Sequence, residues 1–172
     1  MTKPLGVART WDLGGYFPRF DGPEFATFKA NLRSDLARRL KHTSLMTALN
    51  AANVSGWAAE IVAYEQLSTR CGHLGSYLGC LAAADATSEA YKAEEAAFAA
   101  VSAELDKLRG ELLRAMQTVD DPVFALLLAE PSLAGLGHFL GRLRHEAGLR
   151  MSTAEETLAA DLNVDGLHAW GR

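Results

Sequence analysis

Aromatic residues and long apolar runs are both scarce in this chain. Phe, Trp and Tyr make up 8% of the 172 residues, and the 49% hydrophobic share rests mainly on Ala and Leu. This mixture favours helices, and it excludes an extended disordered chain. The longest strongly apolar run, from Phe124 to Ala129, is far shorter than the ~20 residues that span a bilayer. We therefore expect a helical protein of one domain, residues 1–172, with no membrane-spanning helix.

Cysteine is also rare, with two residues in the whole chain. Cys71 and Cys80 fall in one predicted helix, where a separation of nine residues places them about 180° apart around the axis and about 13 Å apart along it. A disulfide needs Cα atoms within about 7 Å, so these two cannot bridge each other, and we expect both to be small buried hydrophobes. Met1 to Phe17 lacks the apolar core of a secretory signal, so the expected compartment is the cytoplasm.

Positive charge is too limited for a general attraction to nucleic acid. The net charge is −4 and the isoelectric point is about 5.7. Basic residues do gather at Arg33, Arg38, Arg39 and Lys41, where they could touch phosphate or RNA. No aromatic stacking residues alternate with them, so a solvated helix face is the better interpretation and no nucleic-acid partner is predicted.

The first 119 residues predict an extended segment followed by long helices. Residues 1–20 contain the turn-forming glycines and prolines, with aromatic residues that can dock on a core: Trp11, Tyr16, Phe17 and Phe20. Asp21-Gly22-Pro23-Glu24 reads as a helix start with Asp21 as a capping carboxylate, and an amphipathic stripe follows it to Leu40. A shorter apolar-periodic segment is expected over residues 45–52.

Two further long helices should form an antiparallel αα-hairpin. Ser55 is expected to cap the first, which runs to about Ala84, and a capped turn over residues 85–88 leads into the second, which ends near Val119. Three glycines inside the first of these helices predict a close helix–helix approach: Gly72, Gly75 and Gly79.

Residues 120–172 predict shorter helices. One runs from Pro122 to Ala129, and another runs from Pro131 or Ser132 to about His145. A capping box at Ser152 starts a helix that ends near Leu162, and a last turn covers residues 165–170. The predicted fold class is all-α, an antiparallel helical bundle built on a long αα-hairpin with shorter C-terminal helices.

Complete catalytic motifs are missing from the sequence. A zinc peptidase needs H-E-x-x-H, but in His145-Glu146-Ala147-Gly148-Leu149 a leucine replaces the second histidine, so His145 is better read as part of a helix C-terminus. Asp165-Gly166-Leu167-His168 is a lone D-x-x-H, better explained as a cap than as a ligand pair. Cys71 and His73 do not face each other on a helix. We therefore predict no catalytic residue, no metal ligand and no cofactor in this chain.

Four stretches in order resemble the N-terminal helical domain of the oligoendopeptidase F family, zinc metallopeptidases related to thimet oligopeptidase. The first joins Trp11-Asp12-Leu13 and Tyr16-Phe17-Pro18 to residues 21–24, and the second is Ser76-Tyr77-Leu78-Gly79-Cys80-Leu81 with residues 84–87. The third runs from Pro131 through His138-Phe139-Leu140 to Arg142-Leu143-Arg144, where the family has P-x-L and H-x-L-x-x-L-R. The fourth, Ser152 to Glu156, lies where the family carries L-S-x-x-E-E.

The resemblance implies a domain that walls one side of a deep channel, admitting short unfolded peptides to a separate peptidase domain that holds the zinc. None of the family's metal or catalytic residues has a matching position here, so this chain by itself is expected to be inactive as a peptidase. The substrate-binding residues are unknown. His138, Tyr77 and Arg142 are conceivable channel residues, although core packing or solvation is the default interpretation for each.

Three functional hypotheses are left open. The chain is a detached or split N-terminal domain of a zinc oligopeptidase, a stand-alone helical binding or assembly module, or an enzyme with an unrecognised site. The first predicts as partner a peptidase domain or separate subunit, or self-association through an apolar surface that involves the N-terminal aromatics and the end near Leu167 and Trp170. Short peptides are the possible small ligands.

Overall fold

The computed structural model describes residues 12–151 and Glu155. These residues contain five α-helices and one short 3-10 helix, with no strand among them, so the predicted all-α fold class is confirmed for the part described. The chain groups into two compact units. The first takes in the residues up to Met46 together with Glu60–Arg109, and the second takes in Thr47–Ala59 together with the residues from Gly110 onward. The prediction of a single domain stays a prediction.

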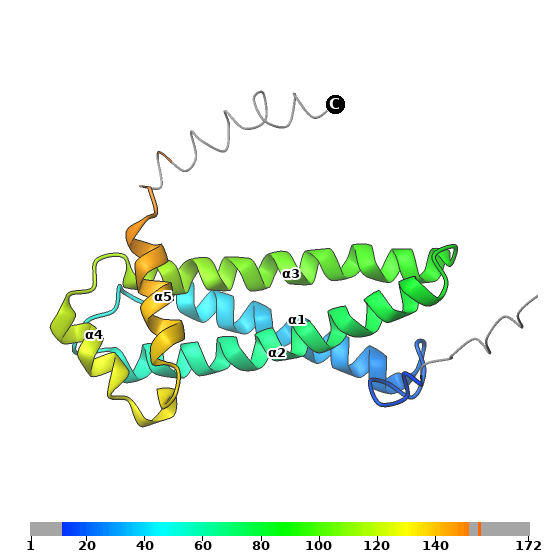
Figure 1. Cartoon of the computed structure of the whole chain (residues 1–172), viewed down its shortest axis with the longest axis horizontal. Coiled ribbons are helices and arrows are strands. Elements are labelled where there is room, and N and C mark those ends of the chain that lie inside the picture. Colours follow the sequence, from blue (N-terminus) through cyan, green and yellow to red (C-terminus); the bar gives the residue numbers. More distant parts are fainter. Residues whose placement is uncertain (1–11, 152–154, 156–172) are drawn as a thin grey trace, which may run out of the picture. The chain divides into compact units, whose positions relative to one another are not determined.

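Three helices build the first unit, and each runs antiparallel to the helix before it. They are α1 (Pro23–Leu45) and the parts of α2 (Val54–Ala84) and α3 (Glu89–Met116) that belong to this unit. The chain runs one way along α1, back along α2 and forward again along α3 (Figure 1). The turn from α2 to α3 is closed by Asp85, whose Oδ1 accepts hydrogen bonds from the Thr87 amide at 3.0 Å and the Thr87 hydroxyl at 2.7 Å. The predicted αα-hairpin and its capped turn are therefore confirmed.

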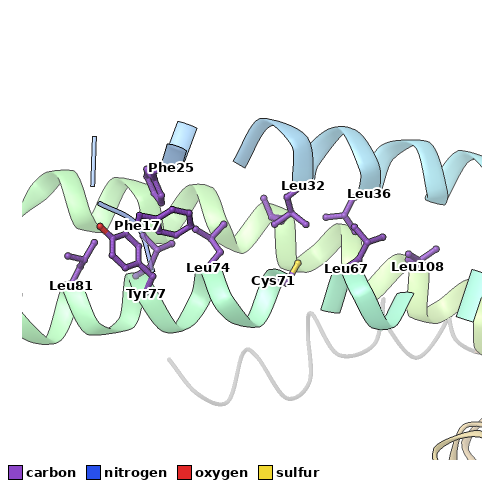
Figure 2. Packing of buried hydrophobic residues seen from close by; sticks show 12 residues of the cluster. Phe17, Phe25, Leu32, Leu36, Leu67, Cys71, Leu74, Tyr77, Leu81 and Leu108 are labelled. Atoms are coloured by element: carbon purple, nitrogen blue, oxygen red, sulfur yellow. The ribbon is translucent and has the colours of Figure 1, made fainter. Parts of the chain in front are cut away.

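Leucines and aromatic side chains at helical spacing form the core of this unit (Figure 2). Leu32 and Leu36 of α1 are buried with Leu67, Leu74 and other apolar residues of α2. The segment before α1 closes one end of the core, because Phe17 packs edge-on against Phe25 and Tyr77, with ring centroids 5.1 and 4.9 Å apart. Three of the predicted core-docking aromatics, Tyr16, Phe17 and Phe20, thus pack on the core, while Trp11 lies outside the described residues.

The start of α1 differs from the prediction. Gly22 is the N-cap residue and makes no side-chain cap, whereas Asp21 lies 3.6 Å from Arg19 as an exposed ion pair. Pro23 in the first turn is as expected and fixes the backbone angle that the helix needs. The expectation that Asp21 caps the helix is therefore wrong.

Residues 46–53, between α1 and α2, form no helix. Asn53 Oδ1 accepts a hydrogen bond from the Asn50 amide at 2.8 Å, and Asn50 Oδ1 accepts one from the Ala52 amide at 2.9 Å. Such side-chain bonds to nearby backbone groups compete with helix formation. The predicted apolar-periodic segment is therefore wrong as a helix. Ser55 is not the cap of α2 either, since its hydroxyl donates to Glu130 at 2.7 Å.

The three glycines of α2 do not share one role. A β-carbon at Gly75 would lie 3.0 Å from the Phe98 ring of α3, which confirms a close approach there. At Gly72 and Gly79 a β-carbon would meet nothing within 4 Å, and both residues are exposed. The prediction of helix contact at these two glycines is wrong, because both lie on the solvent side of α2.

The second unit contains α4 (Asp121–Leu128), η1 (Pro131–Leu133) and α5 (Gly137–Gly148). Asp120 caps α4 by accepting a hydrogen bond from the Val123 amide at 2.9 Å. The sequence predicted one helix from Pro131 or Ser132 to about His145, but the chain turns at Gly135, whose φ is +86°, between η1 and α5. A residue with this left-handed backbone conformation cannot lie inside an α-helix. The region predicted as one helix therefore contains two short elements, η1 and α5.

Other predictions for this part of the chain have mixed outcomes. The helix predicted over residues 122–129 is confirmed by α4. The capping box at Ser152 and the last turn over residues 165–170 lie outside the described residues, Glu155 apart. Within the described part of the chain, no helix is both long enough and apolar enough to span a bilayer.

Candidate functional site

Groups that could hold a metal ion are absent from the described residues, where no three His, Cys, Asp or Glu side chains come together. The sequence predicted that His145 belongs to a helix C-terminus. The structure agrees, because His145 lies in the last turn of α5, which ends at Gly148. Asp165 and His168 lie outside the described part. Two other features of the described residues have unusual chemistry: a buried carboxylate in the first unit and an exposed face of α5 in the second.

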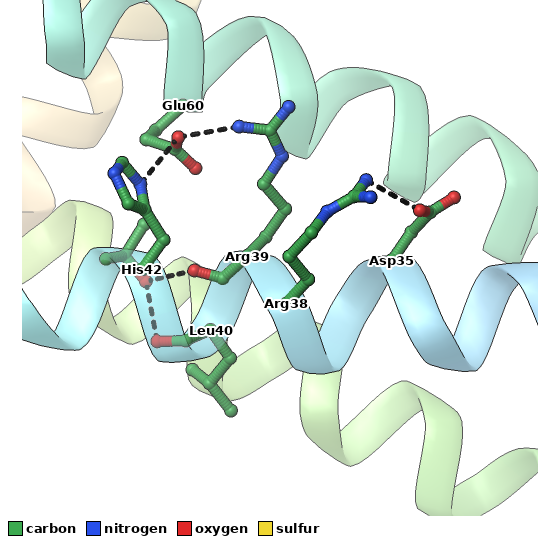
Figure 3. Close-up of polar contacts among 7 residues, drawn as sticks. Asp35, Arg38, Arg39, Leu40, His42 and Glu60 are labelled. Carbon is green, nitrogen blue, oxygen red and sulfur yellow. Dashed lines mark hydrogen bonds and ion pairs between the residues drawn. The ribbon is translucent and has the colours of Figure 1, made fainter.

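The buried carboxylate belongs to Glu60 on α2, whose side chain is 2% exposed. Arg39 Nη1 donates to Glu60 Oε1 at 2.8 Å, and His42 Nδ1 lies 3.0 Å from the same oxygen (Figure 3). Both partners come from the end of α1, where Thr43 Oγ1 donates to the carbonyl oxygens of Arg39 and Leu40. Glu60 therefore ties the last turns of α1 to α2.

One oxygen of this carboxylate is left without a hydrogen bond, because Glu60 Oε2 is buried and has no partner. The contacts of Arg39 and His42 both fall on the other oxygen, Oε1. No nucleophile or second acid lies among these contacts of Glu60. The role of the cluster is therefore structural: its polar contacts hold the end of α1 against α2. This ion pair was not predicted, although Glu60 lies three residues after Trp57 and four before Tyr64, on the apolar stripe of α2.

The outer face of α5 borders a hollow of about 760 Å³. Its lining includes three side chains with basic character, His138, Arg142 and His145, and the exposed Leu149. Gly137 and Gly141 leave open space, since a β-carbon at either position would meet nothing within 4 Å. This face can therefore accept a ligand that has both apolar groups and negatively charged groups.

Exposed apolar side chains are concentrated in the same unit. Five of the six exposed large hydrophobic residues found in the described part of the chain lie between residues 126 and 151: Leu126, Leu128, Phe139, Leu149 and Met151. The sixth is Leu45 at the end of α1. Of the N-terminal aromatics that the structure describes, Phe17 is buried and Tyr16 and Phe20 pack on the core, so an apolar contact surface at this segment stays a prediction. Leu167 and Trp170 lie outside the described residues.

The three conceivable channel residues have different surroundings. Tyr77 is 2% exposed in the core of the first unit, and burial raises the pKa of its hydroxyl. It therefore has the packing role that was the default interpretation. His138 and Arg142 are both exposed on the outer face of α5.

The basic cluster on α1 is largely a solvated face, as predicted. Arg33, Arg38 and Lys41 are exposed, and Arg39 is the exception because it reaches Glu60. Arg38 Nη2 contacts Asp35 Oδ1 at 2.7 Å, while Arg70 Nη1 of α2 donates to Asp35 Oδ2 at 2.6 Å. The hydrogen bond from Arg70 is the main reason that the pKa of Asp35 is lowered, and the charges of Arg70 and Arg38 act in the same direction.

The two cysteines are both free, and they differ in exposure. Cys71 is buried in the first unit, as expected, and burial raises the pKa of its thiol. Cys80 is exposed, so the expectation that both are buried is wrong for Cys80. The reason is its position on α2, where it follows Gly79 on the solvent side of the helix.

Side chains of α5 also fix the local structure of the second unit. Arg144 Nη2 donates to the Val119 carbonyl at 2.9 Å and to Asp121 Oδ1 at 2.7 Å, and its guanidinium lies 4.6 Å from the ring centroid of Phe124. Arg144 thereby joins α5 to the start of α4. It belongs to the Arg142-Leu143-Arg144 stretch on which part of the family resemblance rests.

A family model decides how far that resemblance extends. Residues 116–172 match the model of a peptidase M3 N-terminal domain described as Oligopeptidase F. The resemblance is confirmed over these residues. They form about a third of the chain and include α4, η1 and α5. No catalytic-domain family was found for the chain, and no curated protein and no solved structure matches it.

The oligopeptidase F match covers two of the four stretches that suggested the family, namely residues 131–144 and residues 152–156. The other two, at residues 11–24 and 76–87, lie before the matched region. The described part of the oligopeptidase F region includes the outer face of α5 and all five exposed hydrophobic residues of the second unit.

Proposed function

We propose that this chain is the non-catalytic N-terminal domain of a zinc-dependent oligoendopeptidase and walls the channel through which short peptides reach a peptidase domain outside this chain. The observation that carries the proposal is the oligopeptidase F match over residues 116–172. Zinc and the groups that activate water belong to the peptidase domain in this proposal. The cytoplasm is the proposed compartment.

Packing in the first unit supports a role as a rigid wall. A channel wall has to keep its shape while peptides pass, and α1, α2 and α3 share a core of buried leucines and aromatic rings. Buried or partly buried ion pairs join these helices at two further points, Arg39 with Glu60 and Lys29 with Glu94. Such contacts suit a scaffold better than a mobile catalytic segment.

A second candidate function is a stand-alone helical binding or assembly module without a peptidase role. It is favoured by the five exposed large hydrophobic side chains between residues 126 and 151, because exposed apolar side chains in such number suit a surface that binds a partner. In this case the partner would be a protein without H-E-x-x-H. The two candidates share the inactivity of the chain alone and differ in the partner.

Co-expression separates the two candidates. The chain is produced alone and together with the polypeptide encoded next to it, and each sample is assayed with a fluorogenic short peptide and with an unfolded protein as substrates. We expect no hydrolysis by the chain alone. The pair should cleave the short peptide, leave the long chain intact and lose activity with a zinc chelator.

Hydrolysis by the purified chain alone would contradict both candidates. A stable complex with a neighbour that lacks H-E-x-x-H and cleaves no peptide would favour the assembly module. An H-E-x-x-H substitution in the neighbour serves as the matched control, because it should remove activity and leave complex formation unchanged.

A further inference from the structure

A groove opens within the first unit between α1 and α3. Its volume is about 230 Å³, and two buried side chains, Leu36 and Val101, form its floor. About one turn earlier, the ion pair of Lys29 with Glu94 and the ring of Phe98 fill the same seam and leave a space of only about 10 Å³. The groove is therefore a local opening beside a packed part of the seam.

Short side chains on both helices line the upper part of the groove. Ala37 of α1 and Ala100 of α3 both border it, and both are exposed. The volume lies just below the about 300–1,000 Å³ of clefts that hold drug-sized ligands, so the groove suits a single apolar side chain. Such a side chain would contact Leu36 and Val101 between the two alanines.

The two charged residues of the lining differ in their partners. Arg33 is exposed and makes no ion pair or hydrogen bond with the residues that the structure describes. Glu104 already has a cationic partner, because Lys107 Nζ donates to its Oε1 at 2.6 Å. The uncompensated charge beside the groove is therefore positive, and it favours a ligand that brings a carboxylate to Arg33.

We propose that this groove binds the C-terminal residue of a short peptide whose last side chain is apolar. The terminal carboxylate pairs with Arg33, and the side chain lies over Leu36 and Val101. A C-terminal residue carries both groups on one Cα atom, so it matches an unpaired guanidinium beside an apolar floor. The second carboxylate oxygen of Glu104 can accept a peptide N–H, a donor that a fatty carboxylate lacks.

The choice of a peptide as the ligand rests on the proposed function, in which short peptides pass this chain. The two can fail separately, because binding is measured on the chain alone and hydrolysis is measured on the co-expressed pair. Hydrolysis by the pair without peptide binding in the groove would overturn the groove assignment alone. Peptide binding in the groove without hydrolysis by the pair would overturn the proposed function alone.

Peptide titration of the full chain, followed by amide NMR, tests the groove. The ligand is N-acetyl-Ala-Ala-Leu with a free carboxylate, and the comparison ligands are its C-terminal amide and hexanoate. We expect saturable shifts at the amides of Ala37 and Ala100 with the free acid. The amide peptide should bind at least about threefold more weakly, because it cannot form the charged pair with Arg33.

Two results of the titration would overturn the proposal. The first is the absence of a saturable shift at these alanines up to about 10 mM peptide. The second is binding of hexanoate as tight as that of the free acid, which would point to a fatty carboxylate as the ligand.

Substitution of the guanidinium tests the carboxylate contact. Arg33→Gln should weaken binding of the free acid at least about threefold and leave binding of the amide peptide unchanged. Lys41→Gln is the matched control, because Lys41 is an exposed cation of α1 outside the lining of the groove. An equal loss for both peptides in Arg33→Gln would contradict the pairing.

Filling the groove gives an independent readout. Ala100→Leu should weaken binding of both peptides at least about fivefold, because its side chain takes the space of the ligand. Ala103→Leu is the control, since Ala103 is exposed on α3 outside the lining. Leucine favours helices nearly as well as alanine, so both variants should fold. Equal peptide affinities of the two variants would overturn the placement of the ligand.

Discussion

The ring of Phe98 on α3 lies against the backbone of α2 at Gly75, with Cε1 3.0 Å from the position that a β-carbon would take. Gly75→Leu should therefore overpack this contact and lower the free energy of unfolding by about 1–3 kcal/mol. Gly79→Leu is the matched control, because its β-carbon meets nothing within 4 Å. Thermal or urea unfolding measures both, and equal stabilities would contradict the close approach.

Arg39 should contribute more stability than Arg38, although both carry the same charge on the same helix. The Arg39 partner Glu60 is almost completely buried, whereas the Arg38 partner Asp35 is 29% exposed and keeps Arg70. Arg39→Ala should lower the free energy of unfolding by about 1–3 kcal/mol, and Arg38→Ala by less than about 1 kcal/mol. Urea unfolding of both variants measures the two losses. A larger loss in Arg38→Ala than in Arg39→Ala would contradict the prediction.

Asp35 should make the free energy of unfolding depend on pH in the acid range. Because the hydrogen bond from Arg70 lowers the pKa of Asp35 in the folded state, its contribution is present above the ordinary aspartate pKa and is lost as the pH falls through the lowered one. Asp35→Asn should cost about 1 kcal/mol at pH 7. The difference between the two proteins should shrink below about pH 5. Unfolding measured across pH tests this, and a difference that grows in acid would contradict it.

The two thiols should differ in reactivity. Cys80 is exposed and Cys71 is buried with a raised thiol pKa, so a small alkylating reagent should label the native chain once, at Cys80. In denaturant it should label both. Peptide mass spectrometry after brief labelling locates the adducts, with Cys80→Ser as the control that should stay unlabelled when folded. Rapid labelling of Cys71 in the native state would show that this core opens.

Gly135 should be intolerant of a side chain for a backbone reason. Its φ of +86° disfavours other residues, and no neighbouring atom lies within 4 Å of a β-carbon there. Gly135→Ala should cost about 1–2 kcal/mol through strain alone. Gly137→Ala, two residues later in the first turn of α5, also meets open space and should leave stability unchanged or slightly raised. Equal effects of the two substitutions would argue against the turn.

Helix positions and core faces could largely be predicted from the sequence, since apolar spacing determines both. The stripe from Phe25 to Leu36 predicted the buried side of α1, and Asp85 predicted the turn before α3. The apolar periodicity over residues 45–52 did not lead to a helix, because Asn50 and Asn53 bind backbone groups that a helix would need. Periodicity does not detect this competition.

Features that depend on contacts between helices were less predictable. Gly72, Gly75 and Gly79 look alike in sequence, and only Gly75 faces a ring from α3. Glu60 is a charged residue on an apolar stripe, which was the available signal for a buried ion pair, but its partners Arg39 and His42 come from another helix. The outer face of α5 was suggested only by His138 and Arg142, without the hollow beside them.

Each compact unit is assembled from two separate stretches of the chain. Trp57 is buried in the second unit and donates its indole N–H to the Thr47 carbonyl, and the Leu49 amide donates to the Ala115 carbonyl. During synthesis, residues 47–59 leave the ribosome well before the residues from Gly110 onward that complete their unit. A nascent chain stalled near Arg109 would therefore lack the Ala115 carbonyl that the Leu49 amide binds, and its residues 47–59 would have no partner stretch to complete the unit.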